Sequence, residues 1–197
     1  MKQQSGAPGR GEDGFTLVEL IISMLLTVVV LLIVGGVLVS GLSTQQKVKS
    51  VTTAATTAQQ IARSVQAGVR NASAVNLITD TTAGTQLLLA RVIGGDPAST
   101  AASCQAWYFT PANGGSVYTK RTSPASVITL PGAGPQGIWT LLGAGVSPIA
   151  ATGNVFTAPA GSRVDLTFNV AADSQPYVKI TTTTYTPQTP TVSSPCF

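Results

Sequence analysis

Few side chains in this chain could carry out chemistry. Its 197 residues include no histidine, which removes Ser-His and Cys-His nucleophiles and histidine metal ligands together. The two cysteines, Cys104 and Cys196, are too few to form a zinc site. Residues 73–197 show no paired-carboxylate or nucleophile motif, and their acids are Asp80, Asp96, Asp165 and Asp173. We therefore expect no enzyme activity, no small-molecule substrate, no metal and no cofactor.

One acid, Glu19, is distinguished by its surroundings. It is the single charged residue between Phe15 and Leu42, a predominantly apolar stretch. An acid inside such a segment costs a few kcal/mol to insert into a membrane and is a functional candidate by default. Glu19 could simply reach water at the membrane interface, because it lies near the start of the segment. We favour the interpretation that the Glu19 carboxylate pairs with a cationic partner.

The segment that contains Glu19 is long enough to cross a bilayer. A spanning helix needs about 20 predominantly apolar residues, and residues 15–42 exceed that length without a proline. A secretory signal peptide has a shorter apolar core, of about 7–15 residues, after a positively charged start. Here Glu12 and Asp13 stand where that positive charge belongs. The sequence therefore predicts one transmembrane helix at 15–42.

The junction before the apolar run carries a specific motif, Gly14-Phe15-Thr16-Leu17-Val18-Glu19-Leu20. This motif resembles the class III leader junction of type IV prepilins and type II secretion pseudopilins. The resemblance implies a cytoplasmic leader at residues 1–14, which a prepilin peptidase removes by cutting between Gly14 and Phe15. It also implies that the prepilin peptidase/methyltransferase N-methylates the new amino group of Phe15.

The physical chemistry of the motif agrees with what the resemblance implies. Cleavage leaves an α-ammonium on Phe15, at the end of an apolar helix. In a bundle of such helices, Glu19 of one subunit can pair with the Phe15 ammonium of a neighbour, which offsets the desolvation of both charges. A buried pair of this kind helps to set the register between subunits. The implied partners are the peptidase, other pilin or pseudopilin subunits, and the membrane.

Charge is unevenly distributed along the chain. Residues 43–72 hold four basic residues and no acid, whereas residues 73–197 hold five basic and four acidic residues, a net charge of +1. The C-terminal part therefore has no strong electrostatic footprint for nucleic acid. Lys47 and Lys49 lie just beyond the span, which opposes the positive-inside tendency. The expected orientation, single-pass in the cytoplasmic membrane with the head exported, thus follows from the cleavage motif.

A stripe of small apolar residues follows the span at spacings of three and four. This spacing predicts a helical stem, residues 43–76, that continues from the membrane and ends near Asn71–Asn76. The stripe would be a face packed on the chain's own head, which we favour, or a coiled-coil seam with another chain. Its members are Val48, Val51, Ala55, Ala58, Ala62, Val65, Val69 and Ala72.

Residues 77–197 change in composition to Thr, Ser, Gly and Pro with short β-branched and aromatic runs. The clearest strand pair is Arg163–Ala171, which alternates apolar and polar residues, and Pro176–Thr186 after a polar turn. These patterns predict an α+β, pilin-like fold in which the long helix packs on an antiparallel β head with an irregular C-terminal tail. The other predicted strands are Gln86–Val92, Gln105–Thr110, Ser116–Arg121, Val127–Leu130 and Gly137–Leu142.

Cys104 and Cys196 both lie beyond the predicted span. An even number of cysteines in an exported domain favours one disulfide, with two free thiols as the alternative. The bond would close a loop of about 90 residues and contribute about 4–5 kcal/mol in the chain-entropy model.

The function that the resemblance implies is a structural one. The chain would be a minor pilin or pseudopilin, assembled into a type IV pilus or a type II secretion-like filament at the cell surface or in the equivalent of a periplasm. The alternative is a pilus-borne binding module, an adhesin or a DNA-uptake subunit, in which aromatic side chains stack on a ligand. The aromatic residues considered for that role are Trp107, Tyr108, Trp139 and Tyr177.

Overall fold

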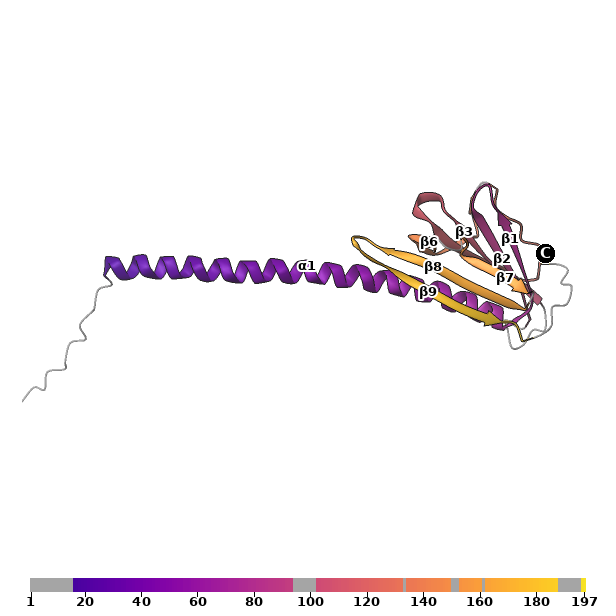
Figure 1. Cartoon of the computed structure of the whole chain (residues 1–197), viewed down its shortest axis with the longest axis horizontal. Coiled ribbons are helices and arrows are strands. Elements are labelled where there is room, and N and C mark those ends of the chain that lie inside the picture. Colours follow the sequence, from indigo (N-terminus) through magenta and orange to yellow (C-terminus); the bar gives the residue numbers. More distant parts are fainter. Residues whose placement is uncertain (1–15, 94–101, 133, 150–152, 161, 188–195) are drawn as a thin grey trace, which may run out of the picture. The chain divides into compact units, whose positions relative to one another are not determined.

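One long helix precedes all the strands of the chain (Figure 1). The computed structural model describes residues 16–93, 102–132, 134–149, 153–160, 162–187 and 196–197. The helix, α1, runs without a break from Leu17 to Arg70, and the chain divides into two compact units, Met1–Gln46 and Lys47–Phe197. A long N-terminal helix followed by antiparallel sheets confirms the predicted α+β, pilin-like fold class.

The first sheet is a five-stranded antiparallel meander in the order β1-β2-β3-β4-β5. Its strands are β1 (Ala72–Asp80), β2 (Thr85–Ile93), β3 (Ala102–Thr110), β4 (Ser116–Thr122) and β5 (Thr140–Ala144). The tight turn between β3 and β4 depends on residues that tolerate positive φ: Asn113 has φ 53° and Gly115 has φ 85°. A Cβ added to Gly115 would overlap the carbonyl of Val146, so only glycine fits there.

The second sheet is built around β8 (Arg163–Ala172). This strand pairs antiparallel with β6 (Val146–Pro148), β7 (Phe156–Ala160) and β9 (Gln175–Tyr185). The alternating pattern of β8 is confirmed, because Val164, Leu166, Phe168 and Val170 are buried and the polar residues between them are partly exposed. The predicted hairpin between this strand and the last one is confirmed as β8–β9.

The second half of α1 packs on the strands of its own unit. The helix residues that become buried are mostly small: Ala54, Ala58, Ile61, Ala62, Val65, Gly68 and Val69. At Gly68 an added Cβ would overlap the six-membered ring of Trp107. The Trp107 indole N–H also donates to Ser64 Oγ at 2.9 Å. Small helix residues therefore allow the close approach of the sheet, and from Ala58 onward the stripe is an intramolecular core face.

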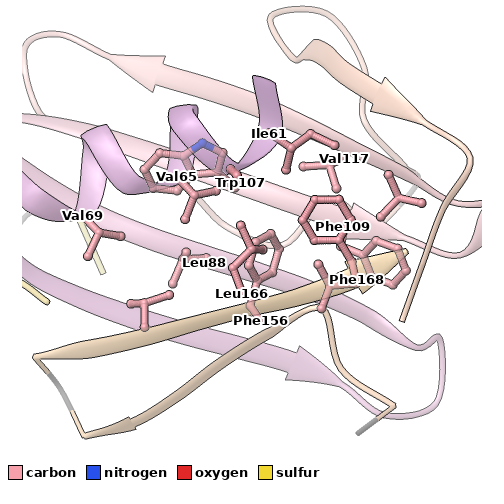
Figure 2. Packing of buried hydrophobic residues seen from close by; sticks show 14 of the residues in the cluster. Ile61, Val65, Val69, Leu88, Trp107, Phe109, Val117, Phe156, Leu166 and Phe168 are labelled. Atoms are coloured by element: carbon pink, nitrogen blue, oxygen red, sulfur yellow. The ribbon is translucent and has the colours of Figure 1, made fainter. Parts of the chain in front are cut away.

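Two apolar clusters lie on the two faces of the first sheet. The larger one joins α1, the inner face of the first sheet and the second sheet, around Leu88, Trp107 and Phe168 (Figure 2). The smaller one covers the outer face of the first sheet, the face turned away from α1. Its fully buried members are Leu87, Leu89, Cys104, Ala106, Tyr108, Ile128 and Cys196. The first sheet is thus apolar on both sides.

A buried glutamine side chain joins the two sheets. Gln86 on β2 is only 2% exposed. Its Oε1 accepts hydrogen bonds from the backbone N–H groups of Val155 (2.7 Å) and Phe156 (3.0 Å). Its Nε2 donates to the Phe156 carbonyl at 3.0 Å and to Asn154 Oδ1 at 3.1 Å. The amide thereby satisfies backbone groups at the start of β7, as buried polar groups require.

The structure corrects the predicted end of the stem and start of the head. The helix ends at Arg70, and Ala72–Asp80 forms β1 rather than the last turns of a stem that reaches residue 76. At the helix end the Ala67 carbonyl accepts both the backbone N–H of Asn71, at 3.3 Å, and the Asn71 side-chain amide, at 2.9 Å. Pairing with β2 along the whole of β1 then favours the strand.

Two further predictions were wrong in detail. Val127–Leu130 is not a strand, although Ile128 is buried at 2% exposure in the outer-face cluster. Within the stripe, Val48 and Val51 are exposed, because the buried face of α1 begins only at Ala54. Strands β1, β6 and β7 were not predicted, since β6 and β7 are too short to show a periodic pattern.

Candidate functional site

The first turn of α1 is organised by its capping residue. Thr16 lies immediately before the helix, and its Oγ1 accepts a hydrogen bond from the backbone N–H of Glu19 at 3.3 Å. Thr16 and Glu19 have the Thr-x-x-Glu spacing of a capping box, which favours a helix start at this position. A carboxylate in the first turn is also stabilised by the positive end of the helix dipole.

Glu19 has no counter-ion within the part of the chain that the structure describes. The one ion pair found there joins Arg163 and Asp165, with a Nη2–Oδ2 distance of 2.8 Å. From Leu17 to Gln46 the chain contains no basic residue. The Glu19 side chain is exposed on the helix surface. Any counter-ion for this carboxylate would therefore come from outside the described helix.

The residues on either side of the predicted cleavage point, Gly14 and Phe15, lie outside the described residues. Cleavage between them and methylation of Phe15 thus stay predictions from the sequence. The described chain begins at Thr16, so the helix starts just after the predicted new N-terminus.

The helix that follows Glu19 is apolar around its whole circumference. Its large apolar side chains from Leu17 to Leu42 are 44–76% exposed, because none of the described residues of the first unit covers them. The helix is long and apolar enough to cross a membrane, with a mean hydropathy of 3.0 over its most apolar window. A helix that is apolar on all sides is typical of a membrane span.

Four hydroxyl groups between Ser23 and Thr44 donate to carbonyl groups of the helix itself. Ser23 donates to the Leu20 carbonyl at 2.9 Å, and Thr27 donates to the Ser23 carbonyl at 2.7 Å. Ser43 and Thr44 both donate to the Ser40 carbonyl, at 2.9 and 3.0 Å. Hydrocarbon offers polar groups no partner, so these internal bonds suit a helix in lipid.

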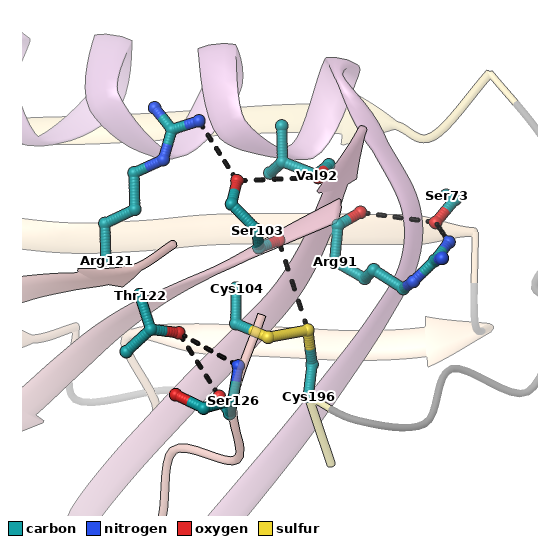
Figure 3. Close-up of a disulfide and its surroundings, with 9 residues drawn as sticks. All are labelled: Ser73, Arg91, Val92, Ser103, Cys104, Arg121, Thr122, Ser126 and Cys196. Atoms are coloured by element: carbon teal, nitrogen blue, oxygen red, sulfur yellow. Dashed lines mark hydrogen bonds between the residues drawn. A yellow bond between two sulfur atoms is a disulfide. The ribbon is translucent and has the colours of Figure 1, made fainter. Parts of the chain in front are cut away.

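The two cysteines are joined in a disulfide that fastens the C-terminus to the outer face of the first sheet (Figure 3). Cys104 lies on β3, both residues are fully buried, and their Cα atoms are 5.5 Å apart. The Cys196 carbonyl also accepts the backbone N–H of Ile128 at 3.5 Å. The bond expected between these cysteines is therefore present, and it holds part of the outer-face cluster in place.

The aromatic residues considered as a stacking surface do not form one. Trp107 and Tyr108 are 0% and 3% exposed and belong to the two apolar clusters. Trp139 is partly buried, with its ring centroid 5.8 Å from that of Tyr108 and 5.7 Å from Lys120 Nζ. Tyr177, on β9, is 67% exposed and stands apart from this group in the sequence. The structure thus uses Trp107 and Tyr108 as core residues.

Two acids of the second unit, Asp165 and Asp80, have structural partners. Asp165 accepts hydrogen bonds from Thr183 Oγ1 at 2.6 Å and Arg163 Nε at 2.9 Å. Burial acts to raise the pKa of Asp165, but these bonds and the Arg163 charge outweigh it and hold the pKa below its usual value. Asp80 accepts the backbone N–H groups of Thr82 and Ala83. Among the described residues, no three His, Cys, Asp or Glu side chains gather as a metal site would require.

Comparison with known proteins bears on the N-terminal segment. Residues 9–42 match the family model of the prokaryotic N-terminal methylation motif. No curated protein and no solved structure shows significant similarity to the chain. The match covers the capped helix start, Glu19 and the apolar span described above. Residues 9–42 therefore carry the signature of type IV pilins and pseudopilins.

Proposed function

We propose that this chain is a structural subunit, a minor pilin or pseudopilin, of a type IV pilus or a type II secretion-like filament. Its leader is cut between Gly14 and Phe15, and Phe15 is N-methylated. The observation that carries the proposal is Glu19: a carboxylate inside the methylation motif, at the start of an apolar helix, without a counter-ion in the described chain.

The chemistry of assembly follows from that carboxylate. In lipid or in a bundle of helices, an unpaired Glu19 carboxylate would be strongly unfavourable. This cost favours association with a subunit that places an ammonium group beside the carboxylate. The Phe15 α-ammonium of a neighbouring subunit supplies this charge once the leader is removed. The apolar surface of residues 17–42 then packs against the same surface of other subunits, and the exported head stays outside.

A pilus-borne adhesin or DNA-uptake subunit draws less support. Trp107 and Tyr108 are core residues, and residues 73–197 have a net charge of +1. Proteins with a pilin-type methylation motif are structural, and residues 73–197 contain no histidine and no glutamate.

The proposal is tested by comparing Glu19→Ala with Ser23→Ala in the full chain, expressed with its own secretion or pilus system. Both positions lie in the same apolar helix and both variants remove one polar side chain. We expect both variants to insert into the membrane and to form the Cys104–Cys196 disulfide. The Ser23→Ala chain should co-purify with filaments, whereas the Glu19→Ala chain should not. Normal filament co-purification of Glu19→Ala would refute the pairing role.

A further inference from the structure

An apolar row crosses the outer face of the first sheet from one edge to the other. Successive strand pairings place its members directly opposite one another, one from each strand: Ile78, Leu87, Tyr108, Tyr118 and Leu141. The centre of the row is covered, since Leu87 is 0% and Tyr108 3% exposed. The two ends are open: Ile78 on the edge strand β1 is 37% exposed and Leu141 on the edge strand β5 is 50% exposed.

The β5 end of the row is apolar and cationic. Ile138, just before β5, is 68% exposed, and Lys120 Nζ lies 5.7 Å from the centroid of the Trp139 ring. No aspartate or glutamate occurs between Ala102 and Ser162, a range that contains β3, β4, β5 and the connection between β4 and β5. We name Lys120 and Leu141 the β5-edge patch.

The β1 end of the row is apolar and anionic. Ile78 and Asp80 are two residues apart on β1, so their side chains lie on the same face of the sheet. The Asp80 carboxylate caps the backbone of the following turn and makes no ion pair with the described residues. We name Ile78 and Asp80 the β1-edge patch. The two patches lie at opposite edges of one sheet face and carry opposite charge.

We propose that the β5-edge patch of one copy of this chain docks on the β1-edge patch of a second copy. The inference rests on the proposed function and requires two copies of this chain to be neighbours in the filament, where assembly through the helices brings their heads together at high effective concentration. An interface between two different patches is heterologous, and when its rotation does not close it generates a helical filament rather than a dimer. Because the two patches carry opposite charge, contact between them is favoured over contact between two β5-edge patches or two β1-edge patches.

Two tagged copies of the full chain, expressed together with the filament system, test the contact. One copy carries Leu141→Cys and the other Ile78→Cys; both positions are exposed, and the native cysteines are occupied by the buried disulfide. Oxidation of purified filaments should link the two tags. Pairing Leu141→Cys with Leu141→Cys, or Leu141→Cys with Thr181→Cys on the exposed face of β9, should give no link.

Charge reversal sharpens the test. Lys120→Glu or Asp80→Lys, introduced into both copies, places like charges at the contact and should lower the yield of the cross-link about tenfold. The two reversals together restore opposite charge and should return the yield to near the starting value. Failure of the double variant to restore it would overturn the docking, as would a link between two Leu141→Cys copies.

Co-purification separates this inference from the proposed function. Chains that enter filaments and still fail to link through Leu141 and Ile78 overturn the docking and leave the filament role intact. Chains that never co-purify with filaments overturn both.

Discussion

The apolar side chains of residues 17–42 and those of the second unit lie in opposite environments. In the first unit the large apolar side chains from Leu17 to Leu42 remain at least 44% exposed. In the second unit Leu88, Trp107 and Phe168 are fully buried among α1 and two sheets. The head therefore completes its own core, whereas the N-terminal helix needs a membrane or other helices to cover it.

Polar groups show the same contrast. In the head, Gln86 is buried and has a protein partner for each of its side-chain atoms, whereas the Glu19 carboxylate has no counter-ion in the described chain. The head thus satisfies its buried polar groups with its own residues, whereas the N-terminal half of α1 does not provide Glu19 with an opposite charge. Substitutions in the head should therefore lower its free energy of unfolding, whereas substitutions in the apolar half of α1 should leave it unchanged.

The largest expected effect on the head comes from its disulfide. Replacing both Cys104 and Cys196 with serine opens a loop with a sequence separation of 92 residues and should lower the free energy of unfolding by about 4–5 kcal/mol. Denaturant unfolding of the full chain in detergent, followed by tryptophan fluorescence, measures this loss. Membrane insertion should be unchanged. An unaltered unfolding midpoint would show that the head does not depend on this link.

Gln86→Leu should have the next largest effect. It removes the partners of the backbone groups at Val155 and Phe156, which are buried, and should cost about 2–4 kcal/mol of stability. Gln59→Leu, on the exposed surface of α1, is the matched control and should be nearly neutral. Equal stability of the two variants in the same unfolding assay would contradict the role of Gln86 between the sheets.

Glycine substitutions compare the two units directly, because α1 has glycines both in its exposed N-terminal half and in the half that packs on the head. Gly68→Ala forces a methyl group into the Trp107 ring and should destabilise the head by about 1–3 kcal/mol, even though alanine favours a helix. Gly36→Ala meets no atom within 4 Å and should leave the unfolding of the head unchanged. A neutral Gly68→Ala variant would show that α1 can move away from the sheet at little cost.

The smallest effect concerns Asp165 and depends on pH. Its pKa is below the usual value in the folded chain, so its stabilising contribution is fully present above the unfolded pKa of about 3.9 and is lost as the pH falls toward the folded pKa. Asp165→Asn should therefore destabilise the head slightly at pH 7 and flatten the acid limb of its stability profile. Parallel profiles for the two proteins below pH 4 would contradict this assignment.

The sequence predicted the parts of the fold that have a long periodic pattern. The apolar run and the small-residue stripe indicated α1, and strict alternation indicated β8. It did not predict β1, because the helical stripe runs on to Ala72, the first residue of the strand, and pairing with β2 then determines the conformation. Gln86 and Gly68 also gave no signal, since their roles depend on β7 and Trp107, which are distant in sequence.

For the candidate site, the sequence was sufficient where the chemistry is local. The motif around Glu19 and the pairing of two cysteines could both be predicted from residue types alone. The edge patches could not, because Lys120 and Leu141 meet on one face only through the register of β4 and β5. Surfaces of this kind emerge from strand order rather than from sequence spacing.

The central claim is that removal of the leader creates the ammonium group that Glu19 requires. Mass spectrometry of the mature chain, isolated from filaments or membranes, tests this directly. We expect a chain of 183 residues that begins with N-methylated Phe15, since 14 residues of the 197 are removed. A mature chain that keeps residues 1–14, or begins at any residue other than Phe15, would contradict the account.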